Sequence, residues 1–125
     1  MNGDEVRARV PGALAAHELT RATVLEAGIV DRELKRLCER SLAGEDVEPR
    51  DERERAALDW AYAVAWNADE ADEALWARLR RHFSEEQLVE LGYFVAITYG
   101  QQRWIKTLGI GHGEVLDLTR AGLAP

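Results

Sequence analysis

Cysteine occurs once in the 125-residue chain, as Cys38, which excludes an intramolecular disulfide and a CxxC redox pair. Positive charge is also scarce, because 16 lysines and arginines stand against 23 aspartates and glutamates and the net charge is −7. This balance argues against a general affinity for phosphate backbones, so no nucleic-acid partner is predicted. The basic residues in 50–55 alternate with acidic ones, which is typical of a solvated helix face.

Long hydrophobic runs are missing as well. No apolar run approaches the roughly 20 residues that a membrane-spanning helix needs, so no membrane partner is predicted. The first ten residues, MNGDEVRARV, lack the basic-then-apolar pattern of a signal peptide, and we expect a cytoplasmic protein. His82 and His112 are too far apart in sequence for a metal-ligand spacing, so we predict no metal. No other cofactor is predicted.

The main apolar feature is the stretch from Ser84 to Gly109. Ser84 and Gln87 form the capping-box pattern of a helix start, and glycine at position 109 is a common helix end. Apolar residues between them face nearly every direction: Leu88, Val89, Leu91, Tyr93, Phe94, Val95, Ala96, Ile97 and Tyr99. The stretch predicts a helix of roughly 35–40 Å, buried on all sides within the domain or between subunits.

Turn and capping signals predict four more helices before this one, over residues 11–28, 31–44, 51–67 and 71–82. A short helix is predicted around residues 113–121, and residues 1–10 and 122–125 are expected to be loose. No alternating strand pattern is present. The sequence therefore predicts a single all-α domain over residues 1–125, with five to six helices around a long buried C-terminal helix.

Three stretches carry a resemblance to a known family: DRELKRL, DERERAALDWAYAV and ALWARLRRHFSEEQLVELGYFVAITYGQQRWIKTLGI. Their order and spacing resemble those of the carboxymuconolactone decarboxylase and alkylhydroperoxidase D-like (AhpD-like) family, over residues 11–110. The resemblance implies an AhpD-like helical bundle that assembles into trimers or hexamers through shared helices.

The chain departs from that family at the catalytic positions. Family peroxidases carry a CxxC pair, a histidine that follows it and a glutamate upstream. In this chain Glu48 and Asp51 stand where the cysteine pair belongs, and Arg36 aligns with the upstream glutamate. The histidine-rich arrangement of the lactone-decarboxylase branch is also missing. CxxC peroxidase chemistry is therefore not expected, and what transfers is the scaffold together with Gln102 and Arg103, which take the place of a family Asn-Arg pair.

The strongest candidate site lies on the last long helix. Tyr99, Gln102 and Arg103 stand at i, i+3 and i+4 and share one face, next to Gly100. Such a polar cluster either forms hydrogen bonds within the protein or between subunits, or it binds a ligand carboxylate or carbonyl. Trp104 and Trp60 are further candidates, as walls of an aromatic pocket or as core residues.

Two weaker candidates for functional residues also have plausible structural roles. Cys38 lies on an apolar helix stripe and is either a buried hydrophobe or a reactive thiol activated by a nearby cation. His17 and Glu18 are adjacent, but neighbours on a helix point about 100° apart, so a partly exposed pair is favoured over a catalytic one.

Three functional hypotheses follow. The first is a small-molecule binder or decarboxylase-like enzyme with its pocket beside the last helix, and no catalytic residue is assigned. The second is a non-catalytic homo-oligomeric interaction protein. The third is a one-cysteine hydroperoxidase that uses Cys38.

Overall fold

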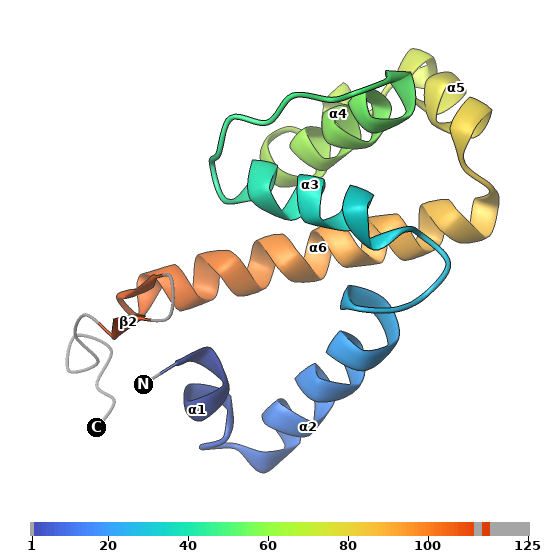
Figure 1. Cartoon of the computed structure of the whole chain (residues 1–125). Helices are drawn as coiled ribbons and strands as arrows, with labels where there is room; N and C mark the ends of the chain where they lie inside the picture. The colour runs from blue at the N-terminus through green and yellow to red at the C-terminus, as the bar shows by residue number, and fades with distance from the viewer. Residues whose placement is uncertain (1, 112–113, 116–125) are drawn as a thin grey trace.

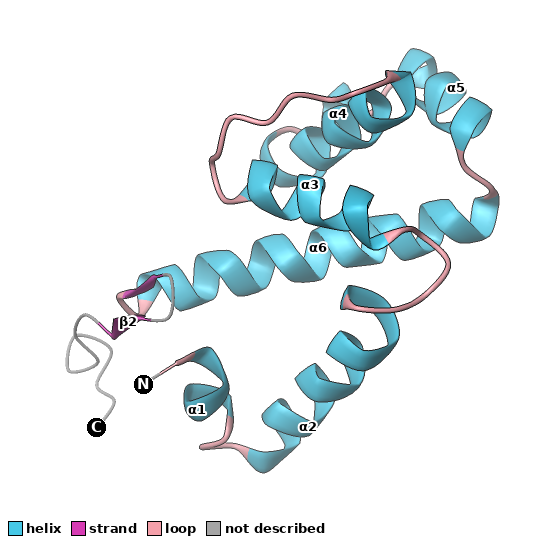
Figure 2. Ribbon diagram, in the orientation of Figure 1, coloured by secondary structure: helices cyan, strands magenta, loops and turns pink. Residues whose placement is uncertain are grey.

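Helix α6 crosses the middle of the molecule and separates two groups of helices. The computed structural model describes residues 2–111 and 114–115. The elements are α1 (Gly3–Arg7), α2 (Pro11–Thr20), the π-helical turn η1 (Arg21–Leu25), α3 (Arg32–Leu42), α4 (Glu52–Trp66), the 3-10 turn η2 (Ala68–Glu70), α5 (Glu73–His82), α6 (Glu85–Thr107), β1 (Ile110–Gly111) and β2 (Glu114–Val115). Helices α3, α4 and α5 lie on one side of α6, and α1 and α2 form an arm on the other (Figure 1). The helical content is evident in Figure 2, and the all-α prediction is confirmed.

The starts of the last four helices follow directly from the sequence. Asp31, Asp51 and Asp72 each accept a hydrogen bond from the backbone N–H three residues later, which satisfies one of the free donors at the helix start. Ser84 and Gln87 form a complete capping box before α6. The predicted boundaries of these helices are therefore correct to within a few residues.

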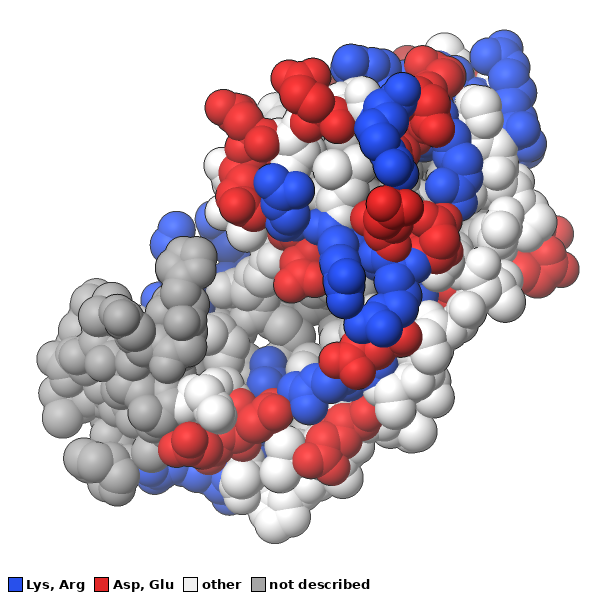
Figure 3. Space-filling view, viewed as in Figure 1, with Lys and Arg blue, Asp and Glu red and all other residues white. Residues whose placement is uncertain are grey.

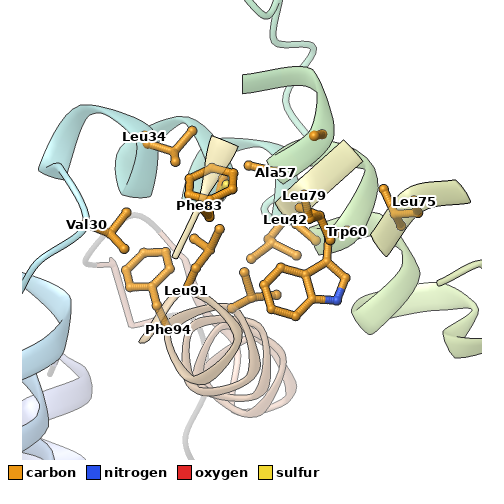
Figure 4. Close-up of a cluster of buried hydrophobic side chains, with 14 residues drawn as sticks. Val30, Leu34, Leu42, Ala57, Trp60, Leu75, Leu79, Phe83, Leu91 and Phe94 are labelled. Carbon is orange, nitrogen blue, oxygen red and sulfur yellow. The ribbon is translucent and has the colours of Figure 1, made fainter. Parts of the chain in front are cut away.

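The hydrophobic core lies between α6 and the α3–α5 group (Figure 4). The fully or largely buried side chains of this core are Val30, Leu34, Cys38, Leu42, Ala56, Ala57, Trp60, Ala61, Leu75, Leu79, Phe83, Leu91, Phe94 and Val95. Gly92 lets the Trp60 ring lie directly against α6, because a Cβ at this position would be 2.9 Å from the ring. Trp76 packs edge-on against Trp60, with ring centroids 5.2 Å apart.

Within the single chain, helix α6 is buried on one side only, so of the two predicted alternatives, burial on all sides inside the domain is wrong and burial between subunits stays a prediction. Val89 is 68% exposed, Tyr93 47% and Trp104 39%. The reason lies in the arm, because α2 has no buried residue and its side chains do not close over α6. In the single chain, the second apolar face of α6 is therefore not covered by a packed core.

The chain ends also differ from expectation. Residues 1–10 were expected to be loose, but α1 is capped by Asn2, and Arg7 is 9% exposed and bonded to Gln101 of α6. Beyond α6, Ile110 pairs with Val115 in the two-residue β1–β2 ladder. The predicted helix over 113–121 is thus contradicted at Glu114–Val115, and its other positions, like residues 122–125, lie outside the described residues.

A buried lysine joins the arm to the body. Lys35 of α3 is 1% exposed, and its Nζ donates to the backbone carbonyls of Val24 at 2.5 Å and Ala27 at 2.6 Å. Its third contact is Glu90 of α6, with Nζ and Oε2 3.2 Å apart. The ammonium therefore donates hydrogen bonds to two carbonyls at the end of the arm, and the carboxylate of Glu90 on α6 balances its charge.

Glu90 fixes the loop that follows the arm. Its carboxylate accepts hydrogen bonds from the backbone N–H groups of Ile29 at 3.1 Å and Val30 at 2.7 Å. Gly28 stands next to this carboxylate with a positive φ of 96°, and a Cβ there would lie 1.9 Å from Glu90 Oε1. Glycine is therefore required at position 28 for two reasons, its backbone conformation and the close approach of Glu90.

Replacing Gly28 by alanine tests this loop, and Gly44 provides a matched control. Gly44 has nearly the same φ, 94°, but nothing lies within 4 Å of a Cβ built there. We expect Gly44→Ala to cost about 1 kcal/mol, from backbone strain alone. Gly28→Ala should cost about 2 kcal/mol more, because Glu90 must also move. Urea unfolding measures both values, and equal losses would contradict the contact with Glu90.

A second prediction concerns pH. Burial acts to raise the pKa of Glu90, but hydrogen bonds from Val30, Ile29 and Lys35 outweigh it, and the pKa lies below the usual 4.5. The resulting stability is complete above the unfolded-state pKa and is lost as pH falls through the folded-state value. Between pH 6 and 3, the wild type should therefore lose more unfolding free energy than Glu90→Gln, by about 1.4 kcal/mol per unit of pKa depression.

The control for this experiment is Glu86→Gln, which makes the same change one turn earlier at an exposed position of α6. Its stability should depend on pH as the wild type's does. Parallel curves for the wild type and Glu90→Gln would show that the carboxylate at position 90 contributes nothing that depends on its charge.

Candidate functional site

A cavity lies between the arm and the exposed face of α6, and we call it the α2–α6 pocket. Its volume is about 440 Å³. It is lined by Arg7, Ala13, Ala16, His17, Thr20, Tyr93, Ile97, Gln101 and Trp104. The four residues from α6 fall at i, i+4, i+8 and i+11 and so share one helix face, while Ala13 and Ala16 of α2 are too small to fill the space. The space-filling view shows the molecule hollowed between arm and body (Figure 3).

Arg7 closes one end of the pocket. Its Nε and Nη2 donate to Gln101 Oε1 at 3.1 and 2.7 Å, and its Nη1 donates to Asp4 Oδ1 at 2.8 Å. The guanidinium also lies 5.7 Å from the centre of the Trp104 ring. These bonds fix the side chain in place, and the guanidinium carries further N–H groups that an acceptor in the pocket can use.

Arg7 belongs to a charged group at this end of the pocket, together with Asp4 and Arg21. Asp4 also accepts two hydrogen bonds from Arg21 Nη2, at 2.8 and 2.9 Å. The hydrogen bond from Arg21 is the main reason that the pKa of Asp4 lies below its usual range, so this carboxyl is ionised. Two guanidiniums and one carboxylate leave one positive charge in the group.

His17 of α2 lies in the same pocket and is half-buried. Burial is the main cause that lowers its pKa, followed by the charges of Arg7 and Arg21, while Asp4 acts in the opposite direction. The imidazole is therefore neutral at pH 7 and presents one donor and one acceptor. A bound anion would raise this pKa by adding negative charge beside the ring.

A smaller space, which we call the inner cavity, adjoins the pocket. Its volume is about 160 Å³, and it is lined by His17, Leu25, Glu39, Phe94, Ile97, Thr98, Gln101 and Gln102. Three of these residues, His17, Ile97 and Gln101, also line the α2–α6 pocket. Gln102 Nε2 donates to the backbone carbonyl of Glu39 at 3.1 Å, whereas its Oε1 is buried and has no hydrogen-bond partner among the described residues.

The predicted cluster of Tyr99, Gln102 and Arg103 is divided between two sides of α6. The Tyr99 ring lies 5.4 Å from that of Trp66 in α4, and the Arg103 guanidinium lies 5.5 Å from the centre of the Tyr99 ring. Gln102 instead reaches α3 and the inner cavity. Successive residues point about 100° apart on a helix, so Gln102 and Arg103 meet different neighbours although both flank Tyr99.

The two tryptophan candidates have different roles. Trp104 lines the α2–α6 pocket. Trp60 is 8% exposed and belongs to the core between α4 and α6, so it forms no wall of either space.

Cys38 is a core residue. Its side chain is fully buried, and burial, followed by the charges of Asp31 and Glu54, raises its pKa to about 12. A protonated and inaccessible thiol is a poor nucleophile, which supports the structural role over the reactive one.

The sequence pattern does not predict Arg7 and Gln101 as site residues, and it favours a partly exposed role for His17 beside Glu18. The spacing of Tyr93, Ile97, Gln101 and Trp104 was a usable signal for the α6 side of the pocket. Nothing in the sequence indicated that Arg7, 94 residues before Gln101, would meet it.

Neither a protein-family model, nor a curated protein, nor a solved structure matches this chain. The carboxymuconolactone decarboxylase resemblance thus remains a hypothesis. Over residues 2–111 and 114–115, no three histidine, cysteine, aspartate or glutamate side chains are grouped so that they could hold a metal ion. Within the same residues, no helix combines the length and the apolar character needed to cross a membrane.

Proposed function

We propose that this protein binds a small organic molecule with a carboxylate or a polarised carbonyl in the α2–α6 pocket. The observation that carries the proposal is the fixed Arg7 guanidinium, which lies at the end of an otherwise largely apolar pocket and has N–H groups to spare. Arginine recognises carboxylates through paired, charge-assisted hydrogen bonds. Asp4 divides its negative charge between Arg7 and Arg21, so it neutralises the Arg7 guanidinium only in part.

The rest of the pocket suits a small organic body. Tyr93, Ile97 and Trp104 offer apolar surface, and 440 Å³ falls in the range typical of small-molecule sites. His17 supplies a neutral imidazole close to the ligand, which suits hydrogen bonding and, if the bound molecule reacts, proton transfer. The resemblance to the decarboxylase family agrees with a ligand of this class and leaves open whether the protein only binds it or also transforms it in a lyase-like reaction.

The test uses benzoate as a probe carboxylate and measures its dissociation constant by NMR titration. Arg7→Met should weaken benzoate binding by roughly 10–100-fold, the value of a charge-assisted hydrogen bond. Arg103→Met is the matched control, since it removes the same charge from an exposed position outside the pocket. It should leave the affinity unchanged.

The opposite result, with binding lost in Arg103→Met and kept in Arg7→Met, would move the site to the Tyr99 side of α6. No binding of benzoate to the wild type at millimolar concentration would reject the proposal for this class of ligand. Circular dichroism of each variant establishes that it is folded, and Arg7→Lys provides a variant that keeps the charge if α1 detaches in Arg7→Met.

A second candidate function is homo-oligomeric assembly through the arm, which the family resemblance implies and one observation favours. Helix α2 has no buried residue, and large apolar side chains in and around the arm and on α6 are exposed, namely Val10, Leu19, Ile29, Val89 and Tyr93. A second copy of the chain packed on the arm would remove this surface from water. The ligand pocket would then lie beside a subunit interface.

Native mass spectrometry measures the number of subunits and any retained small molecule in one experiment. We expect a trimer or hexamer that Leu19→Glu converts to smaller species, because a charge would be buried at the interface. Val64→Glu makes the same change at an exposed apolar position of α4 and should not alter assembly. A monomeric wild type would contradict this second function while leaving the ligand proposal intact.

A further inference from the structure

The inner cavity contains a hydrogen-bond acceptor that lacks a donor. Gln102 Oε1 is buried and, among the described residues, has no partner. The orientation of this amide is fixed by its other end, because Nε2 donates to the Glu39 carbonyl at 3.1 Å. Turning the amide over would bring two acceptor oxygens together. Leaving a buried acceptor unpaired is unfavourable, so a hydrogen-bond donor that enters the cavity would be stabilised by Gln102 Oε1.

The space next to this oxygen is larger than a single water molecule needs. The inner cavity measures about 160 Å³, and much of its wall is apolar, from Leu25, Phe94 and Ile97. A site of about 10–15 Å³ already holds one water, and a water is held well only where several polar groups surround it. The inner cavity therefore has the size and lining for part of an organic molecule.

The inner cavity and the α2–α6 pocket share His17, Ile97 and Gln101, so one ligand can occupy both. Gln101 and Gln102 are adjacent on α6 and point about 100° apart, one holding Arg7 and the other facing the inner cavity. The two polar ends of the combined space therefore differ in kind. Arg7 offers donors and positive charge, and Gln102 offers an acceptor.

We infer that the combined site takes a small hydroxylated carboxylic acid, whose carboxylate binds at Arg7 and whose hydroxyl donates a hydrogen bond to Gln102 Oε1. This inference rests on the proposed function and adds the second polar group of the ligand. A hydroxyl supplies the donor that Gln102 Oε1 lacks, and the apolar side chains of Leu25, Phe94 and Ile97 suit the neutral body that carries it. Sites that pair with a hydroxyl discriminate strongly against analogues without one.

The experiment compares benzoate with 3- and 4-hydroxybenzoate and with their methoxy analogues, on the full chain, by NMR titration. At least one hydroxybenzoate should bind about tenfold or more tightly than benzoate, and its methoxy analogue should lose this advantage because it has no O–H to donate. The side-chain amide signal of Gln102 should shift with the hydroxybenzoate and not with benzoate.

Two variants identify the residue responsible. Gln102→Met should abolish the preference for the hydroxyl while keeping the affinity for benzoate, because it removes the acceptor Oε1 and keeps a side chain of similar length. Gln101→Met is the neighbouring control, and it should weaken all probes alike because Arg7 loses its support. Thermal unfolding followed by circular dichroism checks that each variant is folded.

The outcomes separate this inference from the proposed function. Equal binding of benzoate and both hydroxybenzoates to the wild type overturns the inference and leaves the carboxylate site standing. A hydroxyl preference that survives in Gln102→Met also overturns it, since another acceptor would then be responsible. Failure of every carboxylate to bind rejects the proposed function itself, and the inference with it.

Discussion

One buried charge anchors the end of the arm where it joins the body. Lys35 lies beneath the end of the arm, where its ammonium holds two backbone carbonyls and pairs with Glu90. Removing either partner would leave a buried charge uncompensated, at a cost of about 3–5 kcal/mol. Helix α2 has no buried residue of its own, and Val24 and Leu25 beside this anchor are only partly buried against the core. Together with the bonds between Arg7 and Gln101, the Lys35 contact holds the arm beside α6 at both ends of the pocket.

Helix α6 serves both the core and the pocket. Leu91, Phe94 and Val95 face the α3–α5 group, while Tyr93, Ile97, Gln101 and Trp104 face the arm. A helix with two apolar faces buries each face against another element. In the single chain, the second face of α6 lies opposite α2, and a pocket separates the two helices. The exposed apolar area that results is a place for a ligand, a second copy of the chain, or both.

The electrostatics of the site are local. Positive and negative side chains alternate over the face that carries α3 and α4, so no large region of one sign is seen there (Figure 3). At the pocket, by contrast, Arg7 and Arg21 share a single aspartate, and their charges help to keep His17 neutral. An anion bound there would balance the guanidiniums and bring His17 closer to protonation. Ligand charge and the protonation of the imidazole are therefore coupled.

The sequence by itself determined the local structure. Side-chain oxygens at Asp31 and Ser84 accept bonds from backbone groups only three residues away, so the helix starts could be read directly. The burial of Cys38 also followed from its place on an apolar stripe. These features depend on neighbours within about one helical turn, whose geometry is nearly fixed once a helix forms.

Tertiary structure alone decided the site. The bond between Arg7 and Gln101 joins residues 94 positions apart, and the contact of Gln102 with Glu39 spans 63. Of the three residues predicted as one cluster, Gln102 separated from the other two because it meets α3, whereas Tyr99 meets α4 and Arg103 lies over Tyr99. Spacing along a helix fixes the direction of a side chain, but which element lies in that direction depends on how the whole chain packs.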